Sequence, residues 1–465
     1  MKLLMKIYFK ELVQRFPEFS IRNDYHDIFY TGFSHDSRTV EMGDLYIPIE
    51  GEKYDGHAFI AEAIEAGASG ALCEKGKYDD EWDVLSAPVI LVDSIQEGLQ
   101  KILNYSISHI TAPVVAITGS TGKTVTKEML IRILQCNKSV LSGEKSNTVW
   151  GNASILGKYD GEEVVVLECG MDMPGEIAWH VNSVDPDLGI LLNIGHVHAE
   201  ELGGIEEIYE EKKNLADYME RTGKPLVINI DDEWLDKIFS SYRSDAEIIT
   251  FGKRDDSDYR ISDISVTKDG TDFLLNYYDN HYSVHLNVYG EGQVYNATAA
   301  IVAANRLGIG IEACISEIGK YKGSNGRFEI LNYGQNLTIV NDAYNANPTS
   351  MEMSLNTFNI LYPTSEYHRI VFLGDMKELG DVSIEKHKAL GEQVSNHSFD
   401  EVYFIGEMFE HFGIGKQVGS ADEVAALLNV HMADLKGKKV AILLKASNRI
   451  GLYQVPDFLK KLGLI

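Results

Sequence analysis

A short apolar run that ends in glycine and leads into Gly-Lys-Thr constrains this chain more than any other feature. The run reads VVAITG from Val114, and the stretch that follows the glycines, TKEMLIRIL, has a helical pattern. Short β-branched runs of this kind are typical of buried parallel strands. A strand, a glycine loop and a helix in this order can surround phosphate oxygens with backbone N–H groups and the positive end of the helix. The sequence therefore predicts a P-loop α/β domain that binds a mononucleotide.

The residues of this loop have distinct expected roles. Lys123 is expected to bridge the β- and γ-phosphates of ATP, and the Thr124 hydroxyl is expected to bind Mg²⁺. Only two residues separate the glycines, so the loop is shorter than the usual GxxxxGK[ST] pattern. A glycine turn that binds nothing is the alternative, which the flanking strand and helix disfavour. The predicted ATP-binding loop consists of Gly119, Ser120, Thr121, Gly122, Lys123 and Thr124.

The rest of the chain continues the α/β pattern. Apolar runs from Val164, Leu188 and Pro225 alternate with helical segments, which favours a mainly parallel sheet. Alternating patterns between Asp258 and Tyr289 predict a small antiparallel addition to the same domain.

A chain of 465 residues is too long for one hydrophobic core. The first segment ends near Ile110 to Pro113, and the polar stretch KGSNGR at 322–327 indicates a hinge before further strand–turn units. We therefore predict three α/β domains: an N-terminal domain over 1–110, a central P-loop domain over 111–325, and a Rossmann-like C-terminal domain over 326–465.

Composition excludes several classes of function. The chain has 42 Lys and Arg against 70 Asp and Glu, a net charge of −28, which would repel nucleic acid. The four cysteines form no CxxC pair, so neither a zinc site nor a disulfide framework is expected. No apolar run reaches the roughly 18–20 residues of a membrane span. These features favour a cytoplasmic protein without membrane insertion, and we expect a monomer.

The shortened loop TGSTGKT resembles that of the Mur ligases, and motifs in all three predicted domains extend this resemblance. The matching segments are DSR at 36–38, GEKYDGH at 51–57, ECG with PGEI at 168–177, NIG with His198 and Glu200, DAYNANP at 342–348 and GDMxELG at 374–380.

This resemblance implies an ATP-dependent ligase that forms an amide (peptide) bond. In the family, ATP phosphorylates a substrate carboxylate, and an amine then attacks the acyl phosphate. The last two motifs are most similar to the branch that adds D-alanyl-D-alanine to a UDP-MurNAc-tripeptide, a step of peptidoglycan biosynthesis on which cell wall biogenesis, cell shape and cell division depend. The implied partners are a UDP-linked sugar-peptide and an amino acid or dipeptide.

The resemblance also implies roles for single residues. Glu168 and His198 correspond to side chains that coordinate Mg²⁺, with two ions expected, and Lys212 corresponds to a carbamylated lysine that adds an oxygen ligand. Judged from the residues alone, Lys212 would be a solvated lysine on a charged helix. Lys213 is the alternative if the match is shifted by one residue. The implied nucleotide contacts outside the loop are Asn296, Arg327 and Asp342.

Substrate contacts are implied in all three domains. The residues implied for the UDP-linked substrate are Ser37, Arg38, Asp55, His57, Asn147 and Asn152, and those for the amine are Tyr344, Asn345 and Asn347.

Four motifs depart from the family pattern. The GNxNNxIGxP loop survives only as NTVWGN at 147–152, and GxHNxxN lacks its histidine at 290–296. Asn214 replaces the glutamate of AKxEI, and Arg449 is displaced by one residue from its place in KGSR. Because these segments face the substrates in the family, the departures leave the substrates open.

Three alternatives follow. An archaeal pseudomurein peptide ligase would keep the chemistry with other substrates. A folylpolyglutamate synthetase would share the central fold but lacks a DSR…DGH domain. The third is a nucleotide-dependent scaffold whose active site is no longer functional. The presence of the expected catalytic residues, among them Lys123, Thr124 and Glu168, argues against it.

Overall fold

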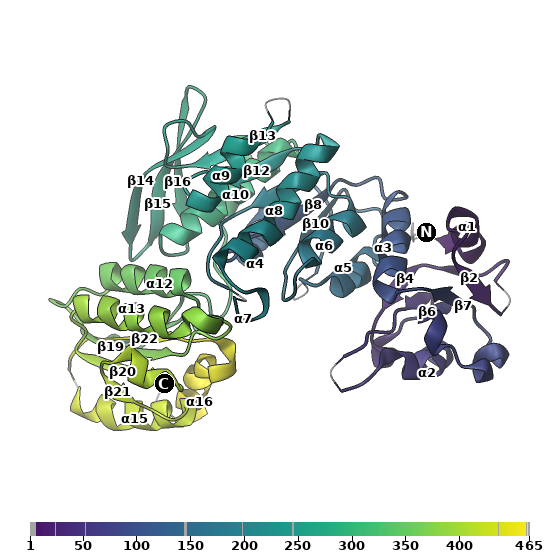
Figure 1. Ribbon diagram of the computed structural model, residues 1–465. Helices are drawn as coiled ribbons and strands as arrows, with labels where there is room; N and C mark the ends of the chain where they lie inside the picture. Colours follow the sequence, from purple (N-terminus) through teal and green to yellow (C-terminus); the bar gives the residue numbers. More distant parts are fainter. Residues whose placement is uncertain are drawn as a thin grey trace.

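The computed structural model describes residues 6–23, 25–51, 53–143, 147–197, 199–243, 246–435, 437–461 and 463. These residues form three α/β units arranged in a row, each built on its own sheet, with the N- and C-terminal units on either side of the central one (Figure 1). The predicted fold class, three α/β domains, is confirmed.

The central unit contains a nine-stranded sheet. Its strands, from edge to edge, are β16 (Asn280–Leu286), β15 (Gly270–Tyr277), β14 (Tyr259–Thr267), β13 (Ile248–Gly252), β12 (Leu226–Asn229), β11 (Leu188–Leu191), β8 (Val114–Thr118), β10 (Val164–Glu168) and β9 (Val140–Ser142). Strands β8 to β13 pair in parallel, whereas β14, β15 and β16 pair antiparallel with one another. The antiparallel addition predicted between Asp258 and Tyr289 is therefore confirmed.

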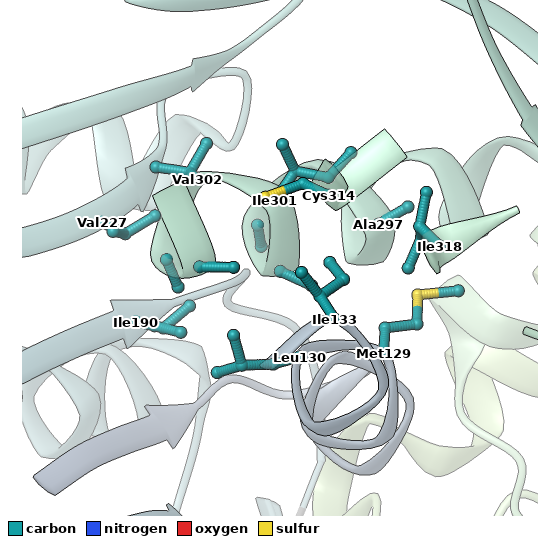
Figure 2. Close-up of a cluster of buried hydrophobic side chains, with 14 of the residues drawn as sticks. Met129, Leu130, Ile133, Ile190, Val227, Ala297, Ile301, Val302, Cys314 and Ile318 are labelled. Carbon is teal, nitrogen blue, oxygen red and sulfur yellow. The ribbon is translucent and has the colours of Figure 1, made fainter. Parts of the chain in front are cut away.

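Helices cover both faces of this sheet because side chains of a buried strand point alternately to either side. Val115 and Ile117 of β8 pack against one helical layer, while Ala116 packs against the other. Figure 2 shows the first layer, in which Leu130 and Ile133 of the helix after the P-loop lie beside the sheet and its neighbouring helices. The first layer consists of α4 (Lys123–Leu134), α10 (Glu291–Arg306) and α11 (Ile311–Ile318); the second consists of α6 (Glu176–Val184), α7 (Ala199–Leu202), α8 (Ile205–Thr222) and α9 (Glu233–Ser241).

The N-terminal unit contains a five-stranded sheet and a two-stranded pair. The five strands, in order, are β2 (Ser20–Arg22), β7 (Val89–Val92), β6 (Gly70–Glu74), β5 (Asp44–Tyr46) and β4 (Gly32–Ser34); the pair is β1 (Ile7–Tyr8) with β3 (Phe29–Tyr30). Only β2 runs antiparallel to its neighbour in the larger sheet. Its helices are α1 (Phe9–Arg15), α2 (Ile60–Glu65) and α3 (Ile95–Ile107).

The N-terminal and central units share one hydrophobic core. Leu99 and Ile102 of α3 belong to the same buried cluster as Trp179 of α6 and Leu156 of α5 (Val149–Leu156). Gly157, the residue directly after α5, lies so close to β4 that a Cβ atom on it would be 2.7 Å from the Cα of Gly32. The two units are therefore joined by dry packing as well as by the chain itself.

The C-terminal unit contains a six-stranded sheet between two helical layers. Its strands, in order, are β17 (Glu329–Tyr333), β18 (Leu337–Asn341), β22 (Val440–Lys445), β19 (His368–Gly374), β20 (Glu401–Ile405) and β21 (Lys416–Gln417). All neighbours are parallel except β17 and β18. Helices α12 (Pro348–Leu361), α13 (Ser383–Asn396) and α14 (Phe409–Phe412) lie on one face, and α15 (Ala421–Asp434) and α16 (Val455–Lys461) lie on the other. The domain limits of 1–110, 111–325 and 326–465 remain our proposal; each described sheet lies within one of these ranges.

The contact between Gly157 and β4 leads to a prediction about stability. Gly157 has an ordinary helical φ of −61°, so the substitution Gly157→Ala brings only a steric clash with the backbone of Gly32 and Phe33. We expect it to lower the free energy of unfolding by about 1–3 kcal/mol. Urea unfolding followed by tryptophan fluorescence measures this, because Trp150 and Trp179 contact each other edge to face at the same junction.

Gly76→Ala is the matched control, because no heavy atom lies within 4 Å of its added Cβ. It should leave stability unchanged or raise it by up to about 1 kcal/mol. Equal unfolding midpoints for both variants would contradict close packing at this junction.

Candidate active site

A cleft of about 600 Å³ separates the central and C-terminal units. Its central wall contains the P-loop and the start of α10, and its other wall contains residues 342–347 and the start of α12. These two walls are in contact with each other where α12 packs beside β14 and α10. The predicted ATP-binding loop and the predicted amine-binding segment therefore face the same space, although more than 200 residues separate them in the sequence.

The backbone of the P-loop depends on its two glycines. Gly119 has φ +156° and Gly122 has φ +84°, and the second is a left-handed conformation that suits glycine. A Cβ atom on Gly122 would also be 2.2 Å from Oδ1 of Asn296. Asn296 therefore closes one side of the loop, and a larger residue at position 122 would displace it.

The end of β11 holds the loop in place from the opposite side. The Thr121 N–H donates to Oδ1 of Asn193 at 2.8 Å, and the Asn193 amide donates back to the Thr121 carbonyl at 3.1 Å. Ser120 Oγ accepts from the Gly195 N–H at 2.8 Å and donates to the Gly195 carbonyl at 2.9 Å. Asn193 and Gly195 belong to the NIG motif, so this motif supports the loop that precedes α4.

The last two residues of the loop, Lys123 and Thr124, differ in their partners. The Lys123 ammonium donates to the Gly119 carbonyl at 2.7 Å and thus lies over its own loop. Burial lowers its pKa, and the nearby charge of Glu168 opposes that shift. The Thr124 hydroxyl donates to Oε1 of Glu168 at 3.0 Å. A hydroxyl and a carboxylate therefore meet beside the ammonium, which is the hard oxygen donor set that Mg²⁺ prefers.

Lys127 is a residue of this site that the sequence analysis missed. It is 2% exposed, and its ammonium lies 3.2 Å from Oε2 of Glu168 and donates to the Gly143 carbonyl at 2.7 Å. In the sequence it is one polar residue of an amphipathic helix, with no motif that distinguishes it. Only the position of β10 next to α4 reveals its role.

Lys212 and Lys213 occupy opposite environments on α8. Lys212 is 1% exposed, and the contact described for its ammonium is the Met171 sulfur at 3.6 Å. Burial, together with the charge of Lys123, keeps the pKa of Lys212 well below its ordinary value, with Glu211 opposing the shift. Lys213 instead forms an ion pair with Asp217 one turn further on, with 2.5 Å between the charged atoms.

Glu211 supports the adjacent PGEI motif. It is buried, and its two carboxylate oxygens accept from the N–H groups of Gly175 and Ile177 at 2.8 and 2.7 Å. The backbone donors at the start of α6 are thereby satisfied by a side chain from α8.

The three predicted nucleotide contacts all line the cleft. Asn296 lies on α10, where it accepts from the Thr126 hydroxyl at 3.4 Å. The Arg327 guanidinium stacks on the Tyr344 ring, 4.2 Å from its centre. Asp342 accepts from the Phe328 N–H at 3.0 Å and forms an ion pair with Lys445, also at 3.0 Å. The structure brings these residues to one space, and their contact with nucleotide stays a prediction.

The hinge before Arg327 is tied to the P-loop helix. Glu128 of α4 accepts from the Tyr321 hydroxyl at 2.6 Å and also from the Ser324 hydroxyl. On either side of Ser324, Gly323 and Gly326 have φ of +82° and +71°. The chain can thus turn at two glycines while the segment between them stays attached to α4.

The predicted amine-binding residues lie on the opposite wall. Tyr344 and Asn345 are exposed to the cleft, and the Asn345 carbonyl accepts from the buried Lys445 ammonium at 2.8 Å. Asn347 caps α12, because its Oδ1 accepts from the Ser350 N–H at 2.9 Å in a reciprocal capping box. The composition of this segment is thus explained in part by the helix it starts, and its role in binding an amine stays a prediction.

The predicted residues of the N-terminal unit lie outside this cleft, since none of its described lining residues comes from that unit. Asp55 accepts from the ring of His57 at 2.6 Å, and His57 accepts from the Glu74 N–H at 3.2 Å. Despite its partial burial, hydrogen bonds from Lys77 and His57 hold the pKa of Asp55 well below its usual range. The DGH motif therefore joins a turn to β6.

The DSR motif contains one buried and one exposed side chain. Ser37 is buried and donates to Oε1 of Glu62 at 3.2 Å, whereas the side chain of Arg38 is 82% exposed. Arg38 binds the carboxylate of Asp36 and lowers the pKa of that group to about 2. An exposed guanidinium at the surface of a protein with net charge −28 is a suitable contact for a diphosphate.

The two asparagines of the NTVWGN segment at 147–152 differ in exposure. Asn147 is exposed and lines the cleft, and its carbonyl accepts from the Gly170 N–H at 2.7 Å. Asn152 is fully buried in α5, where its amide donates to the Glu168 carbonyl at 3.1 Å and lies 3.2 Å from the His180 ring. Asn152 thus supports the end of β10, and its predicted contact with substrate stays a prediction.

His198, the fourth member of the predicted catalytic set, lies outside the described residues. The segments around it are described. The Glu200 N–H donates to the Glu378 carbonyl at 3.3 Å, which places the NIG segment of the central unit against the GDMxELG segment of the C-terminal unit. Within the described part of the chain, no three His, Cys, Asp or Glu side chains gather as a metal cluster, and no helix is long and apolar enough to span a membrane.

Comparisons with known proteins assign all three units to one family. The Mur ligase family, catalytic domain, matches residues 29–106; the Mur ligase middle domain matches 117–304; and the Mur ligase, glutamate ligase domain, matches 326–448. The UDP-N-acetylmuramoyl-tripeptide–D-alanyl-D-alanine ligase of Bacillus subtilis is 32% identical over 379 residues, which cover 81% of this chain and 80% of that protein.

The fold of this chain is also similar to those of two solved structures. A MurF ligase from Thermotoga maritima in complex with ADP is 29% identical, with a TM-score of 0.80 over 92% of this chain and 97% of that chain. A pseudomurein peptide ligase type C from Methanothermus fervidus is 18% identical, with a TM-score of 0.67 over 92% and 95%. The second likeness concerns the fold alone. Taken with the P-loop, its asparagine support and the shared cleft, the family matches establish that this chain belongs to the Mur ligase family.

Proposed function

We propose that this chain is an ATP-dependent, ADP-forming ligase that adds D-alanyl-D-alanine to a UDP-N-acetylmuramoyl-tripeptide in peptidoglycan synthesis. The observation that carries the proposal is the cleft in which Lys123 and Thr124 face Asp342 and Asn345. One wall carries groups that suit a triphosphate, and the other carries the motif of the branch that uses the dipeptide. The relative in Bacillus subtilis is named for that same reaction.

The chemistry requires two steps at one place. A carboxylate oxygen of the UDP-linked peptide attacks the γ-phosphorus of ATP, and ADP leaves. The amine nitrogen of the dipeptide then attacks the acyl carbon, loses a proton, and expels phosphate. Catalysis of such steps is mainly positioning and neutralisation of charge, and Lys123 supplies a positive charge at the P-loop.

The residues present fit a bound Mg²⁺. The Thr124 hydroxyl and the Glu168 carboxylate are neighbours at 3.0 Å, and both line the cleft. These two residues and His198 would hold the ions, of which we propose two. A bound Mg²⁺ would neutralise the charge of phosphate oxygens.

We propose that Lys212 carries a carbamate. Its amine is buried beside a thioether, and its lowered pKa leaves more of it neutral near pH 7 than an exposed lysine would be. The neutral amine attacks CO₂, forms an N–C bond and releases one proton, which converts a buried base into an anion. That anion would compensate the positive charge of Lys123, which otherwise disfavours a charged Lys212.

The UDP-linked substrate is proposed to bind between the N-terminal unit and the cleft. Arg38 supplies an exposed guanidinium for the diphosphate, and Asn147 lies where the central unit opens into the cleft. The amine is proposed to enter beside Tyr344 and Asn345. Closure of the C-terminal unit about the glycines of the hinge would bring the amine to the acyl phosphate and exclude water.

A pseudomurein-type ligase remains the second candidate, because the loops that face the substrates differ from the family pattern. The identity of 32% to a D-alanyl-D-alanine ligase, against 18% to the pseudomurein ligase, favours the first candidate. We further propose that the protein acts in the cytoplasm as a monomer, without nucleic acid, which its net charge of −28 would repel.

Removal of the Lys123 ammonium tests the ATP site. Lys123→Ala should lower phosphate release by a factor on the order of 100 to 1000, because the charge opposite the transferring phosphate is lost. The measurement is substrate-dependent phosphate release at saturating ATP, with thermal unfolding as the check of the fold. Near-normal turnover in a folded variant would show that this loop is not the ATP site.

Lys212 and Lys213 form a matched pair of variants for the carbamate. Lys212→Ala should lose activity that short carboxylates such as acetate partly restore, whereas Lys213→Ala should stay active, since its ammonium forms an ion pair with the exposed Asp217. A ¹³C signal from labelled bicarbonate should be present in the wild type and absent from Lys212→Ala. Because only the neutral amine reacts, this signal should decrease as the pH is lowered. A wild-type enzyme that turns over without the signal would refute the carbamate.

The choice of amine separates the two candidate functions. With a UDP-N-acetylmuramoyl-tripeptide and ATP, D-alanyl-D-alanine should support turnover, while single L-amino acids should support little. The measurement is formation of the peptide product by mass spectrometry, together with ADP. Turnover with a single amino acid alone would assign the chain to a pseudomurein-type or another Mur-type reaction.

A further inference from the structure

Lys127 is a buried cation whose place in the site differs from that of the P-loop lysine. Its side chain lies on α4, one turn after Lys123, and is 3% exposed. A fully buried lysine is rare unless it is paired, because removal of an ammonium from water is costly. Its two partners therefore indicate what it is there to hold.

The first partner is the carboxylate of Glu168 at the end of β10. Oε2 of this carboxylate lies 3.2 Å from the Lys127 ammonium, and Oε1 accepts from the Thr124 hydroxyl at 3.0 Å. Both oxygens are thus contacted from α4, by residues three positions apart, which share one face of a helix. The carboxylate can hardly rotate without breaking one of these contacts.

The second partner is the backbone at the end of β9. The Lys127 ammonium donates to the Gly143 carbonyl at 2.7 Å, and the preceding Ser142 hydroxyl donates to the Val166 carbonyl of β10, also at 2.7 Å. Four residues further along the chain, the Asn147 carbonyl accepts from the Gly170 N–H at 2.7 Å. Gly143 and Asn147 are therefore each held by a hydrogen bond, and Lys127 supplies the one to Gly143, at the end of β9.

We propose that Lys127 is a positioning residue that joins two parts of the reaction. Through Glu168 it orients the carboxylate proposed to hold Mg²⁺, and through Gly143 it fixes the end of β9, four residues before Asn147, which is proposed to contact the UDP-linked substrate. This role rests on the proposed function. Because one ammonium holds both groups, binding of the magnesium nucleotide and binding of the UDP-linked substrate are expected to be coupled, and such coupling is reciprocal.

Lys127→Met tests the proposal with a side chain of similar length and no charge. We expect the gain in ADP affinity on addition of Mg²⁺, measured by calorimetry, to fall roughly tenfold or more, as for other residues that orient a metal ligand. The KM for the UDP-linked peptide should also rise, while the KM for the dipeptide stays unchanged, because the amine-binding wall does not contact Lys127.

Lys127→Arg separates the two contacts. A guanidinium can still pair with the Glu168 carboxylate, but its larger planar fork places its donors differently from an ammonium that lies 2.7 Å from the Gly143 carbonyl. We expect this variant to keep most of the Mg²⁺ effect on ADP affinity and to raise the KM for the UDP-linked peptide. It also provides a second variant if Lys127→Met does not fold.

Arg369→Met is the matched control for loss of a buried cation. Arg369 is 1% exposed in the C-terminal unit and donates to the carbonyls of His397 and Ser398 at 2.6 and 2.9 Å, away from the cleft. It should lower the unfolding temperature and leave both the Mg²⁺ effect and the two KM values unchanged. The same pattern in the folded Lys127 variants would overturn the proposal and make Lys127 a merely structural residue.

Two measurements keep this test independent of the named substrates. The Mg²⁺ effect on ADP affinity needs no peptide, and hydrogen exchange of residues 140–143 in the free enzyme reports on the end of β9 directly. We expect faster exchange there in Lys127→Met and wild-type rates in Arg369→Met. If the wild type does not use the UDP-linked peptide, the proposed function fails, while these two measurements still decide the role of Lys127.

Discussion

The packing of α4 against the central sheet and against α10, its neighbour in the same layer, is the contact on which the site depends. Leu130 and Ile133 bury one face of this helix, so its N-terminus is held at the carboxyl end of β8. Its polar side then reaches three parts of the protein: Thr124 contacts Glu168, Lys127 contacts the end of β9, and Glu128 contacts the hinge. A displacement of this one helix would disturb phosphate, metal and domain contacts together, since it carries all three.

The distribution of charge resolves an apparent conflict in the composition. A protein with net charge −28 has to attract substrates that are themselves anions. Two of the cations around the site are buried, because Lys127 and Lys445 are each 3% exposed or less. Charges in a cleft of low dielectric are screened weakly by salt, so a few buried lysines can outweigh many acidic groups on the surface.

Sequence reasoning found those parts of the fold and site whose signals are local. The P-loop could be predicted because a β-branched strand, two glycines and a helix follow one another directly. The role of Lys127 could not, because its partners come from strands 16 and 41 positions away. Likewise, the pattern of α8 is that of a charged surface helix, and only its packing against α6 shows that Lys212 is buried while Lys213 is not. Asn152 and Asn347 illustrate the reverse case, in which a residue matched to a motif also has a structural task.

The core shared by the first two units has a consequence for how this protein is made. Trp179 and Val184 pack in the same cluster as α3, although the N-terminal segment ends, by its sequence, near residue 110. A nascent chain that has just emerged to that point therefore lacks much of the apolar surface that covers α3. At the usual speed of a ribosome, the missing side chains arrive after a delay on the order of 10 s. During this interval the apolar face of α3 lacks part of its packing, so the core shared by the first two units is complete only when both have been made.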